Sequence, residues 1–224
     1  MRLLPKAIRC QDIGVVKKVK SSEFILATAN PGKIKEMSEI LSGFGIEAVT
    51  RDDLGIDIDV EETGVTFIEN AKIKAEAICL ASKMPAIADD SGLVVEALDG
   101  RPGVYSSSFG GEDLTAEQRC RFLLDSMKNM EQRDAKFVCT IVCAFPDGKI
   151  LTSTGECNGT ILTEIRGSNG FGYDPVFSVF LPDGHTKTMA ELSSEEKNKI
   201  SHRGKALAEF RVLLGTKGGN ELEV

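Results

Sequence analysis

The sequence predicts an α/β protein with a long, twisted, mixed β-sheet that is flanked by helices. Two observations carry this prediction. Short apolar runs typical of strands alternate with helical patterns, and Asp147-Gly148 is typical of a tight turn between two of those runs. A tight hairpin joins antiparallel strands, so the sheet is expected to be mixed rather than purely parallel. With 224 residues, the chain is long enough for one large domain or for two lobes around a cleft.

The first predicted unit is a buried strand over residues 24–29 that runs directly into a helix. Asn30 is a good N-cap and Pro31 suits the first helical position, so the helix should begin there. Its apolar face repeats at helical spacing: Ile34, Met37, Ile40, Leu41 and Phe44. A strand that ends at a helix N-terminus is an arrangement that forms anion sites.

Three more helices are expected at capping boxes, in which the first and fourth residues satisfy each other's backbone N–H groups. These boxes begin at Thr66, Thr115 and Ser193. Strand-like runs cover residues 86–88, 93–98, 137–145 and 149–154. Both faces of the 137–145 run are fairly apolar, which predicts a central strand covered on both sides.

The bulk composition is that of a globular protein, with 42% hydrophobic and 27% charged residues. Lysine and arginine number 27 against 34 acidic residues, and a net charge of −7 argues against a nucleic-acid partner. A small anion is compatible with this charge, because it needs only a few local cations. No apolar run is long enough to span a bilayer, so no membrane partner is expected.

The cysteines favour a reducing compartment, so we expect a cytoplasmic protein. None of the six cysteines forms a C-x-x-C pair, and Cys139 and Cys143 are expected to be reduced thiols in the core. Residues 1–22 are basic but lack the apolar stretch of a signal peptide. We therefore expect a flexible N-terminal extension over 1–22, a domain over 23–216 and a C-terminal tail over 217–224.

The turn over residues 28–33 is the first candidate site. Backbone N–H groups at the helix start, with Asn30 and Lys33, suit a phosphate group. The alternative is an ordinary strand–helix turn with a solvated lysine, and the short motif alone favours that alternative. It is not a P-loop, because the chain contains no G-x-x-x-x-G-K-[ST] sequence.

Acidic residues supply the second candidate site. Asp89 and Asp90 follow an apolar run, which places two carboxylates at or near the end of a strand, where α/β sites form. One carboxylate suits Mg²⁺ and the other suits a general base, whereas the alternative is an Asp-rich turn. Glu61 or Glu62 could supply a further oxygen ligand to a hard cation; the alternative is that both are solvated acidic residues at the surface. Lys74 cannot share a helix face with Lys72, so at most one of them faces a cleft.

Two later segments have the composition of a ligand site. The glycine-rich loop over 167–175 carries Phe171 and Tyr173, either of which could stack on a base; the alternative is a flexible loop. The segment 195–204 lies on or beside a helix, where Lys197, Ser201 and Gly204 fall roughly on one side. Clustered cations on an acidic chain favour an anionic or keto-bearing ligand, although a lone histidine is usually structural.

In their order along the chain, these motifs resemble those of the inosine triphosphate pyrophosphatase family, which hydrolyses non-canonical purine nucleoside triphosphates. The matching segments are Ala27-Thr-Ala-Asn-Pro-Gly-Lys33, Glu62-Thr-Gly-Val-Thr-Phe-Ile-Glu-Asn-Ala71, Ala86-Ile-Ala-Asp-Asp-Ser-Gly-Leu93, Phe171-Gly-Tyr-Asp-Pro175 and Ile200-Ser-His-Arg-Gly204. The resemblance covers the chain from Phe24 to Leu214. It implies a mixed sheet in two lobes with the active-site cleft between them, a Mg²⁺ cofactor and a homodimer.

The resemblance also implies a role for individual residues. Asp90, with Asp89 beside it, is expected to be catalytic, and Asp90 with Glu62 or Glu61 is expected to serve Mg²⁺. The residues expected to bind the purine nucleoside triphosphate (ITP, dITP or XTP) are Thr28, Ala29, Asn30, Pro31, Gly32, Lys33, Lys74, Ser91, Phe171, Gly172, Tyr173, Asp174, Lys197, His202 and Arg203. Two alternatives remain: a pyrophosphatase for pyrimidine or modified nucleotides, and a nucleotide sensor with no use for the carboxylates.

Overall fold

The computed structural model describes residues 23–217, so the predictions for residues 1–22 and for the tail beyond 217 lie outside the described residues. Seven strands form one mixed sheet in the order β2-β1-β3-β4-β5-β6-β7. Their bounds are β1 Phe24–Leu26, β2 Ala48–Thr50, β3 Ala86–Val95, β4 Asp134–Ala144, β5 Ile150–Ile161, β6 Phe177–Phe180 and β7 Thr186–Thr188. The first three strands in this order are parallel, and from β3 onward each pair is antiparallel.

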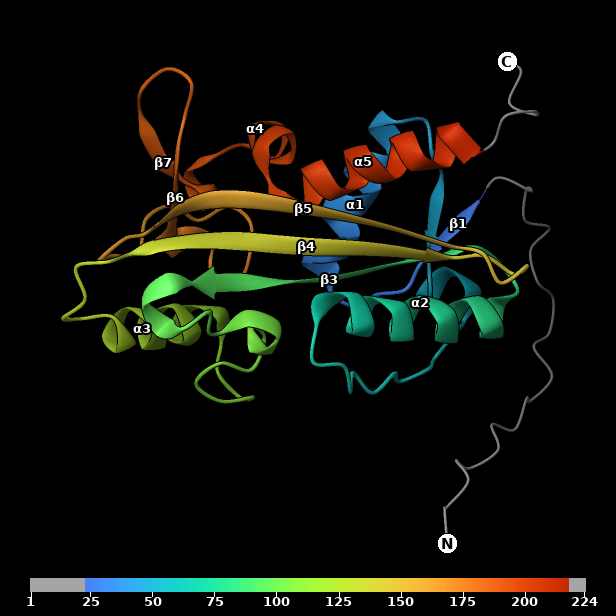
Figure 1. Ribbon diagram of the computed structural model, residues 1–224, viewed down its shortest axis with the longest axis horizontal. Coiled ribbons are helices and arrows are strands. Elements are labelled where there is room, and N and C mark those ends of the chain that lie inside the picture. Colours follow the sequence, from blue (N-terminus) through green and yellow to red (C-terminus); the bar gives the residue numbers. More distant parts are fainter. Residues whose placement is uncertain (1–22, 218–224) are drawn as a thin grey trace, which may run out of the picture.

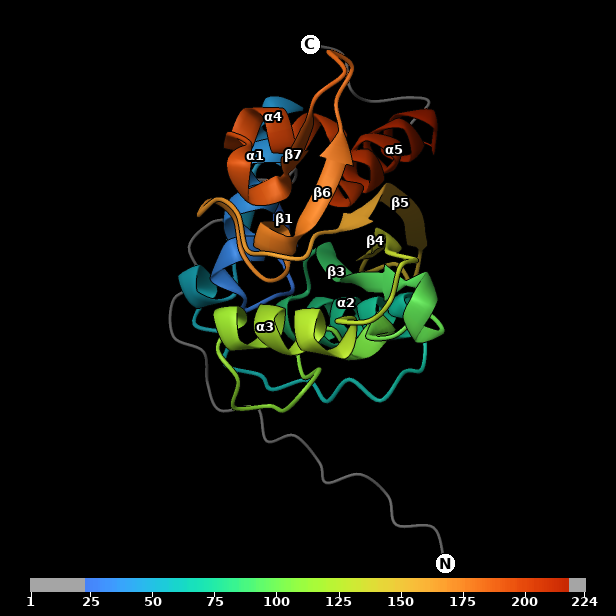
Figure 2. The same cartoon turned by 90° about the vertical axis from the view of Figure 1, so that its left-hand side faces the viewer.

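Five α-helices cover the two faces of this sheet. They are α1 Pro31–Gly43, α2 Phe67–Ser82, α3 Ala116–Ser126, α4 Ser194–Ile200 and α5 His202–Lys217. Helices α1, α4 and α5 lie on one face, and α2 and α3 lie on the other (Figures 1 and 2). The predicted α/β class and mixed sheet are confirmed, whereas the division into two lobes stays a prediction.

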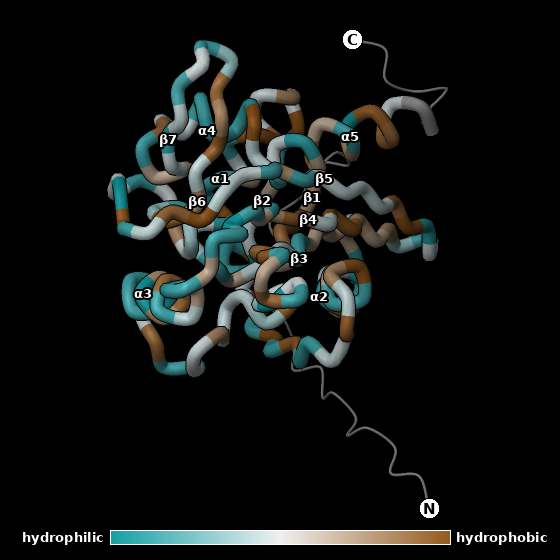
Figure 3. Tube along the Cα trace, turned by 60° about the vertical axis from the view of Figure 1, so that its left-hand side comes forward, coloured by the Kyte–Doolittle hydropathy of each residue, from teal (hydrophilic) through white to brown (hydrophobic). Residues whose placement is uncertain are grey.

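Strand β4 lies at the centre of the core, as its two apolar faces predict. Cys139, Ile141 and Cys143 pack with Phe210 of α5, and the alternate residue Val142 packs with α2. Cys139 and Cys143 are free buried thiols, which confirms their predicted state. The hydrophobic segments gather where these central strands meet the helices (Figure 3). Among residues 23–217, no helix combines the length and apolarity that a bilayer crossing requires.

The predicted helix starts are confirmed by their capping contacts. Asn30 accepts a hydrogen bond from the backbone N–H of Lys33 at 3.1 Å, and Pro31 is the first residue of α1. Complete capping boxes begin at Thr66, Thr115 and Ser193, where the expected glutamate or glutamine closes each box. The turn at Gly148 is also confirmed, since it connects β4 to β5 and Gly148 has a φ of 87°.

The strands differ from prediction in length and number. Residues 86–88 and 93–95 of the predicted runs belong to one strand, β3, which ends at Val95, whereas residues 96–98 form a short 3₁₀ turn. Two aspartates and a glycine made this stretch look like a break, but pairing with β4 continues through all of it. Strands β2, β6 and β7 have only three or four residues each, too few for an alternating pattern to reveal.

Candidate active site

A pocket of about 870 Å³ opens where the parallel strands β1 and β2 end beside β3. Strand β1 ends at Leu26, opposite Ile87 of β3, so its chain turns away before β3 reaches its two aspartates. The predicted location of Asp89 and Asp90 at a strand end is therefore wrong. They lie in the middle of β3, and the neighbouring strand ends instead, which leaves the edge of β3 open to the pocket.

The turn between β1 and α1 forms one wall of the pocket. Thr28 accepts a hydrogen bond from the backbone N–H of Asn30 at 3.2 Å, and Asn30 caps α1. This orders the chain so that the start of α1, with its partial positive charge, faces the pocket. The lining residues of the turn are Thr28, Ala29, Asn30, Pro31, Gly32 and Lys33.

Asp89 and Asp90 lie in different surroundings because successive side chains of a strand point to opposite faces. Asp89 is fully buried, pairs with Lys33 and accepts a hydrogen bond from Arg203 Nε at 3.0 Å. Burial alone would raise the pKa of Asp89, but the charges of Arg203 and Lys33 outweigh burial and hold this pKa well below its usual range. Cys139 Sγ also donates to Asp89, at 3.1 Å. Asp89 is thus a fixed anion beneath the pocket and does not line it.

Asp90 does line the pocket and has a raised pKa. Asn70 Nδ2 donates to one carboxylate oxygen at 3.4 Å, and Lys74 Nζ lies 3.4 Å from the other. Burial raises the pKa of Asp90 more than the neighbouring lysines lower it. A carboxyl group with a raised pKa in a pocket is a candidate general base.

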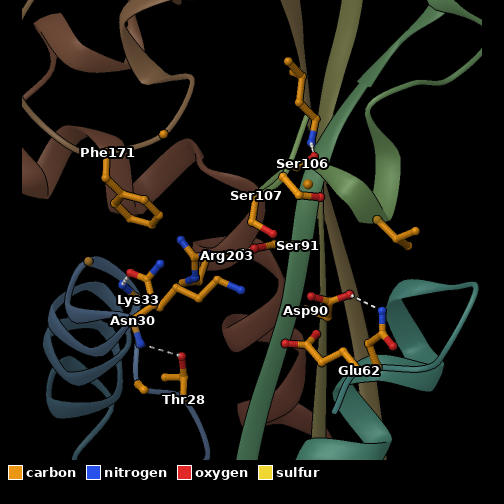
Figure 4. A pocket seen from close by; sticks show the side chains of 18 of the residues that line it. Thr28, Asn30, Lys33, Glu62, Asp90, Ser91, Ser106, Ser107, Phe171 and Arg203 are labelled. Carbon is orange, nitrogen blue, oxygen red and sulfur yellow. Dashed lines mark hydrogen bonds between the residues drawn. The ribbon is translucent and has the colours of Figure 1, made fainter. Parts of the chain in front are cut away.

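Glu62 stands beside Asp90, and Lys74 bridges the two carboxylates. Lys74 Nζ is 2.8 Å from Glu62 Oε2, and Figure 4 shows Glu62 and Asp90 side by side. Burial alone would lower the pKa of Lys74, but Asp90 and Glu62 offset burial and leave it raised. Of the two candidate glutamates, Glu62 lines the pocket, whereas Glu61 is exposed outside it. Lys72 is half-exposed, 3.8 Å from Glu76 on another side of α2.

The adjoining wall consists of the glycine-rich loop and the helices α4 and α5. Lys197 Nζ contacts Asp174 at 2.5 Å and Glu36 at 2.6 Å. Arg203 pairs with the other oxygen of Glu36 and donates to Ser91 at 3.0 Å. Glu36 of α1 therefore holds both cations in place. The phenyl ring of Phe171 lies 5.1 Å from Lys197 Nζ and 5.6 Å from Arg203 Cζ.

The expected helical spacing of Lys197, Ser201 and Gly204 is wrong. Helix α4 ends at Ile200, and Ser201 is extended, with a ψ of 157°. A new helix, α5, begins at His202, so Lys197 and Arg203 come from two helices that meet at the pocket. Little in the sequence marks this break, because the segment contains no proline and its only glycine, Gly204, lies after it.

Two further pocket residues, His202 and Tyr173, are buried. The His202 ring stacks on Phe137 with 4.7 Å between ring centroids, and its Nδ1 has no hydrogen-bond partner among residues 23–217. Burial lowers the pKa of His202 well below its usual value. Tyr173 donates from its hydroxyl to the carbonyl of Ser106 at 2.9 Å. Of the two aromatic residues predicted to stack on a base, Phe171 therefore remains, and its ring lies beside the pocket (Figure 4), which Tyr105 also lines.

Sequence reasoning missed several residues of the pocket. Glu36 lies three residues after Lys33, one turn along α1, and this spacing was the one available signal. Arg51 follows β2, a strand too short to detect. The segment 106–108 also lines the pocket, and Ser106 accepts a hydrogen bond from the backbone N–H of Leu93 at 2.8 Å.

Several known proteins are similar to this chain in both sequence and fold. It is 50% identical over 187 residues to the dITP/XTP pyrophosphatase of Desulfotalea psychrophila, covering 84% of this chain and 82% of that protein. It is 48% identical over 187 residues to the protein of the same name from Escherichia coli K12, covering 82% and 93% respectively. A HAM1 protein structure from Coxiella burnetii matches with a TM-score of 0.76 and 40% identity, over 87% of this chain and 98% of that one.

A second solved structure, the Ham1 protein of Staphylococcus aureus, matches with a TM-score of 0.75 and 41% identity, over 87% of this chain and 99% of that one. Residues 24–213 match the Ham1 family, a span that begins at β1, ends in α5 and includes every segment that lines the pocket. Sequence, fold and extent agree, and the chain belongs to the Ham1 family.

Proposed function

We propose that this chain is a nucleoside triphosphate pyrophosphatase that hydrolyses ITP, dITP and XTP to the monophosphate and pyrophosphate. The observation that carries this proposal is the pairing of two unlike walls in one pocket. One wall offers a helix N-terminus, lysines and two carboxylates, and the other offers an aromatic ring with buried polar groups. The first suits a triphosphate and the second suits a base. The names of the related proteins support the purine substrates.

The donor set at Glu62 and Asp90 fits Mg²⁺. Both carboxylates reach one point, Lys74 Nζ, so a cation can replace or accompany the ammonium group there. Mg²⁺ needs only one or two protein carboxylates, because water and substrate phosphates supply its other ligands. Glu62 and Asp90 would hold the ion, and the ion would neutralise charge on the phosphates and the leaving pyrophosphate.

The reaction that this arrangement favours is attack of a water molecule on the α-phosphorus. The water oxygen bonds to this phosphorus, the bond to the oxygen that bridges to the β-phosphate breaks, and pyrophosphate leaves. Asp90 accepts the proton of the water, a role that its raised pKa supports. Lys33 and Lys74 stabilise the charge that develops on the phosphoryl oxygens. Asp89 holds Lys33 and Arg203 in position from beneath.

Base selection is assigned to the wall around Phe171. The ring would stack on the purine, with Gly172, Tyr173, Asp174, Lys197, His202 and Arg203 around the base and sugar. A 6-keto group accepts hydrogen bonds, whereas the 6-amino group of ATP would place donor against donor. An unpaired buried polar group costs about 1–3 kcal/mol, so ATP is expected to be a poor substrate.

The cellular role that follows is removal of deaminated purine nucleotides from the nucleotide pool. We assign the activity to residues 23–216 and place it in the cytoplasm, which suits the five free buried cysteines that the structure describes. We further propose that the chain forms a homodimer. Light scattering on the full chain would measure a mass near 48 kDa, twice the 24.2 kDa of one chain, and a mass of one chain would refute the dimer.

Pyrophosphate release from ITP, dITP, XTP, GTP, ATP and dTTP, with Mg²⁺ and with a chelator, tests the enzyme assignment. We expect Mg²⁺-dependent release from ITP, dITP and XTP, with GTP, ATP and dTTP left almost intact. Preferential release from dTTP would favour a pyrimidine house-cleaning enzyme instead. Binding of ITP without release from any nucleotide would favour a nucleotide sensor.

A further inference from the structure

Among residues 23–217, six lysine and arginine side chains line the pocket, and five of them already have partners there. Lys33 pairs with Asp89, and Lys74 pairs with Glu62 and Asp90. Lys197 and Arg203 share Glu36, and Arg119 donates to three backbone carbonyls. Most of the positive charge in the pocket is thus compensated before any nucleotide enters.

Arg51 is the exception among the pocket cations of residues 23–217. Its side chain makes no hydrogen bond or ion pair in this part of the chain, and its buried Nε lacks any hydrogen-bond partner there. Its backbone is fixed, because its carbonyl accepts hydrogen bonds from the N–H groups of Leu54 at 3.2 Å and Ile56 at 2.9 Å. A guanidinium on an ordered turn, half-buried and unpaired, is prepared for an anionic ligand.

The place of Arg51 in the fold indicates which part of a nucleotide it meets. Arg51 directly follows β2, the first strand in the sheet order, beside the turn over 28–33 that follows β1. The loop with Phe171 leads into β6, the sixth strand in that order. The Phe171 ring itself packs over Gly32 of the turn over 28–33, so the placement of Arg51 follows from its own segment, which continues to Glu62. With the base at Phe171 and the phosphates at the Glu62–Asp90 pair, the terminal phosphates lie towards the segment that begins at Arg51. Residues 59 and 60 and Glu62, which follow the Arg51 turn in sequence, line the pocket too.

We propose that Arg51 binds the terminal phosphates of the substrate, the part that leaves as pyrophosphate. This inference rests on the proposed function and adds to it a specific contact for the leaving group. The planar guanidinium can donate two hydrogen bonds to phosphate oxygens, and no carboxylate among residues 23–217 forms an ion pair with it. Arg51 therefore distinguishes a triphosphate from a monophosphate, while the paired cations hold the α-phosphate and the base.

Calorimetric binding of inorganic pyrophosphate and of IMP, each with Mg²⁺, tests the proposal without requiring turnover. In Arg51→Gln we expect pyrophosphate affinity to fall about tenfold or more, as for a lost hydrogen bond to a charged group. IMP affinity should stay within about twofold, because IMP lacks the phosphates that Arg51 meets. Arg51→Lys keeps the charge but loses the paired N–H donors of the guanidinium. Its pyrophosphate affinity should therefore lie between those of the wild type and of Arg51→Gln.

Arg121→Gln is the matched control, since it removes the same charge from α3 at a largely exposed site outside the pocket. It should bind both ligands like the wild type, and circular dichroism should show all variants folded. Unchanged pyrophosphate affinity in Arg51→Gln, or an equal loss for IMP, overturns the proposal. Failure of the wild type to bind pyrophosphate overturns it as well. ITP hydrolysis by the wild type is assayed separately, so failure of the proposed function appears there alone.

Discussion

Asp89 and Asp90 are neighbours in sequence, yet the structure shifts their pKa values in opposite directions. Asp89 sits against two cations and keeps its charge, whereas burial makes the charge of Asp90 unfavourable. The alternation of side chains along a strand is the cause, because it sends one carboxylate beneath the sheet edge and the other into the pocket. Function and stability are therefore separated between two adjacent residues.

Replacement of Asp90 by asparagine should abolish turnover without loss of the fold. Removal of a general base lowers kcat by about 10²–10⁴-fold. The pKa of Asp90 is raised in the folded state, so this group contributes stability below its unfolded pKa and loses that contribution as pH rises through the folded pKa. At neutral pH its charge is unfavourable, and Asp90→Asn should melt at or above the wild-type temperature. A variant that melts far lower would contradict this account.

The raised pKa of Asp90 also predicts the acidic limb of the pH–rate profile. A general base must be deprotonated, so kcat/KM should fall as pH drops through a value above the ordinary Asp pKa of about 4. Steady-state kinetics on ITP at several Mg²⁺ concentrations would measure this limb, which should move to lower pH as Mg²⁺ rises, because a cation at Asp90 favours its charged form. An acidic limb that does not move with Mg²⁺ concentration would show that a group other than Asp90 accepts the proton.

Replacement of Asp89 by asparagine should destabilise the protein instead. The depressed pKa of Asp89 means that its stabilisation is present above the unfolded pKa and is lost as pH falls through the folded value. Removing one partner of a buried ion pair costs about 3–5 kcal/mol. Urea unfolding at neutral pH would measure this loss, with Asp90→Asn as the matched comparison. Equal stability of the two variants would refute the difference in their roles.

At the scale of elements, the start of α1 and the glycine-rich loop are in direct contact. A Cβ atom built on Gly32 would lie 2.6 Å from the ring of Phe171, so the absence of a side chain there allows Phe171 to pack over the helix start. The phosphate wall and the base wall therefore meet at one contact between two loops far apart in sequence.

Gly32→Ala should displace the Phe171 ring and raise KM for ITP by about tenfold, because stacking on a base contributes about 1–3 kcal/mol. Gly43→Ala in the same helix is the matched control, since no atom lies within 4 Å of its Cβ position. It should leave KM unchanged and stabilise α1 by up to about 1 kcal/mol. Steady-state kinetics and thermal melting of both variants measure these effects, and equal KM values would refute the Phe171 contact.

Local signals in the sequence predicted most of the helices and the hairpin. The features that were not predicted depend on contacts between residues far apart in the sequence. Asn30, Thr66, Thr115 and Ser193 each satisfy backbone groups within three residues, so the sequence around them is sufficient. The continuity of β3 through Asp89 and Asp90 depends on pairing with β4, 50 residues later. Glu36 likewise acquires its role only when α4 and α5 fold back onto α1.

For the whole molecule, the same distinction separates the fold from the site. The apolar pattern of β4 predicts a central strand with helices packed on both faces, because both of its apolar faces must be buried. The pocket results from three parallel strands that end at different residues, and no pattern in any one strand records where its neighbour stops. Arg51 is an example, since it follows a three-residue strand and reaches the pocket only because β2 and β1 end side by side.

Hydrogen exchange of the whole chain should reveal one ligand site assembled from distant segments. Without ligand, amides of β4 should exchange most slowly, because this strand is covered on both faces. With IMP, pyrophosphate and Mg²⁺, protection should increase together in residues 28–33, 51–64 and 167–175, since one bound set of ligands contacts all three. The tip of the β6–β7 hairpin, over 181–185, lies outside the pocket and serves as the internal control. Protection confined to a single segment, or equal protection at the hairpin tip, would contradict a site that spans the pocket from β2 to the loop before β6.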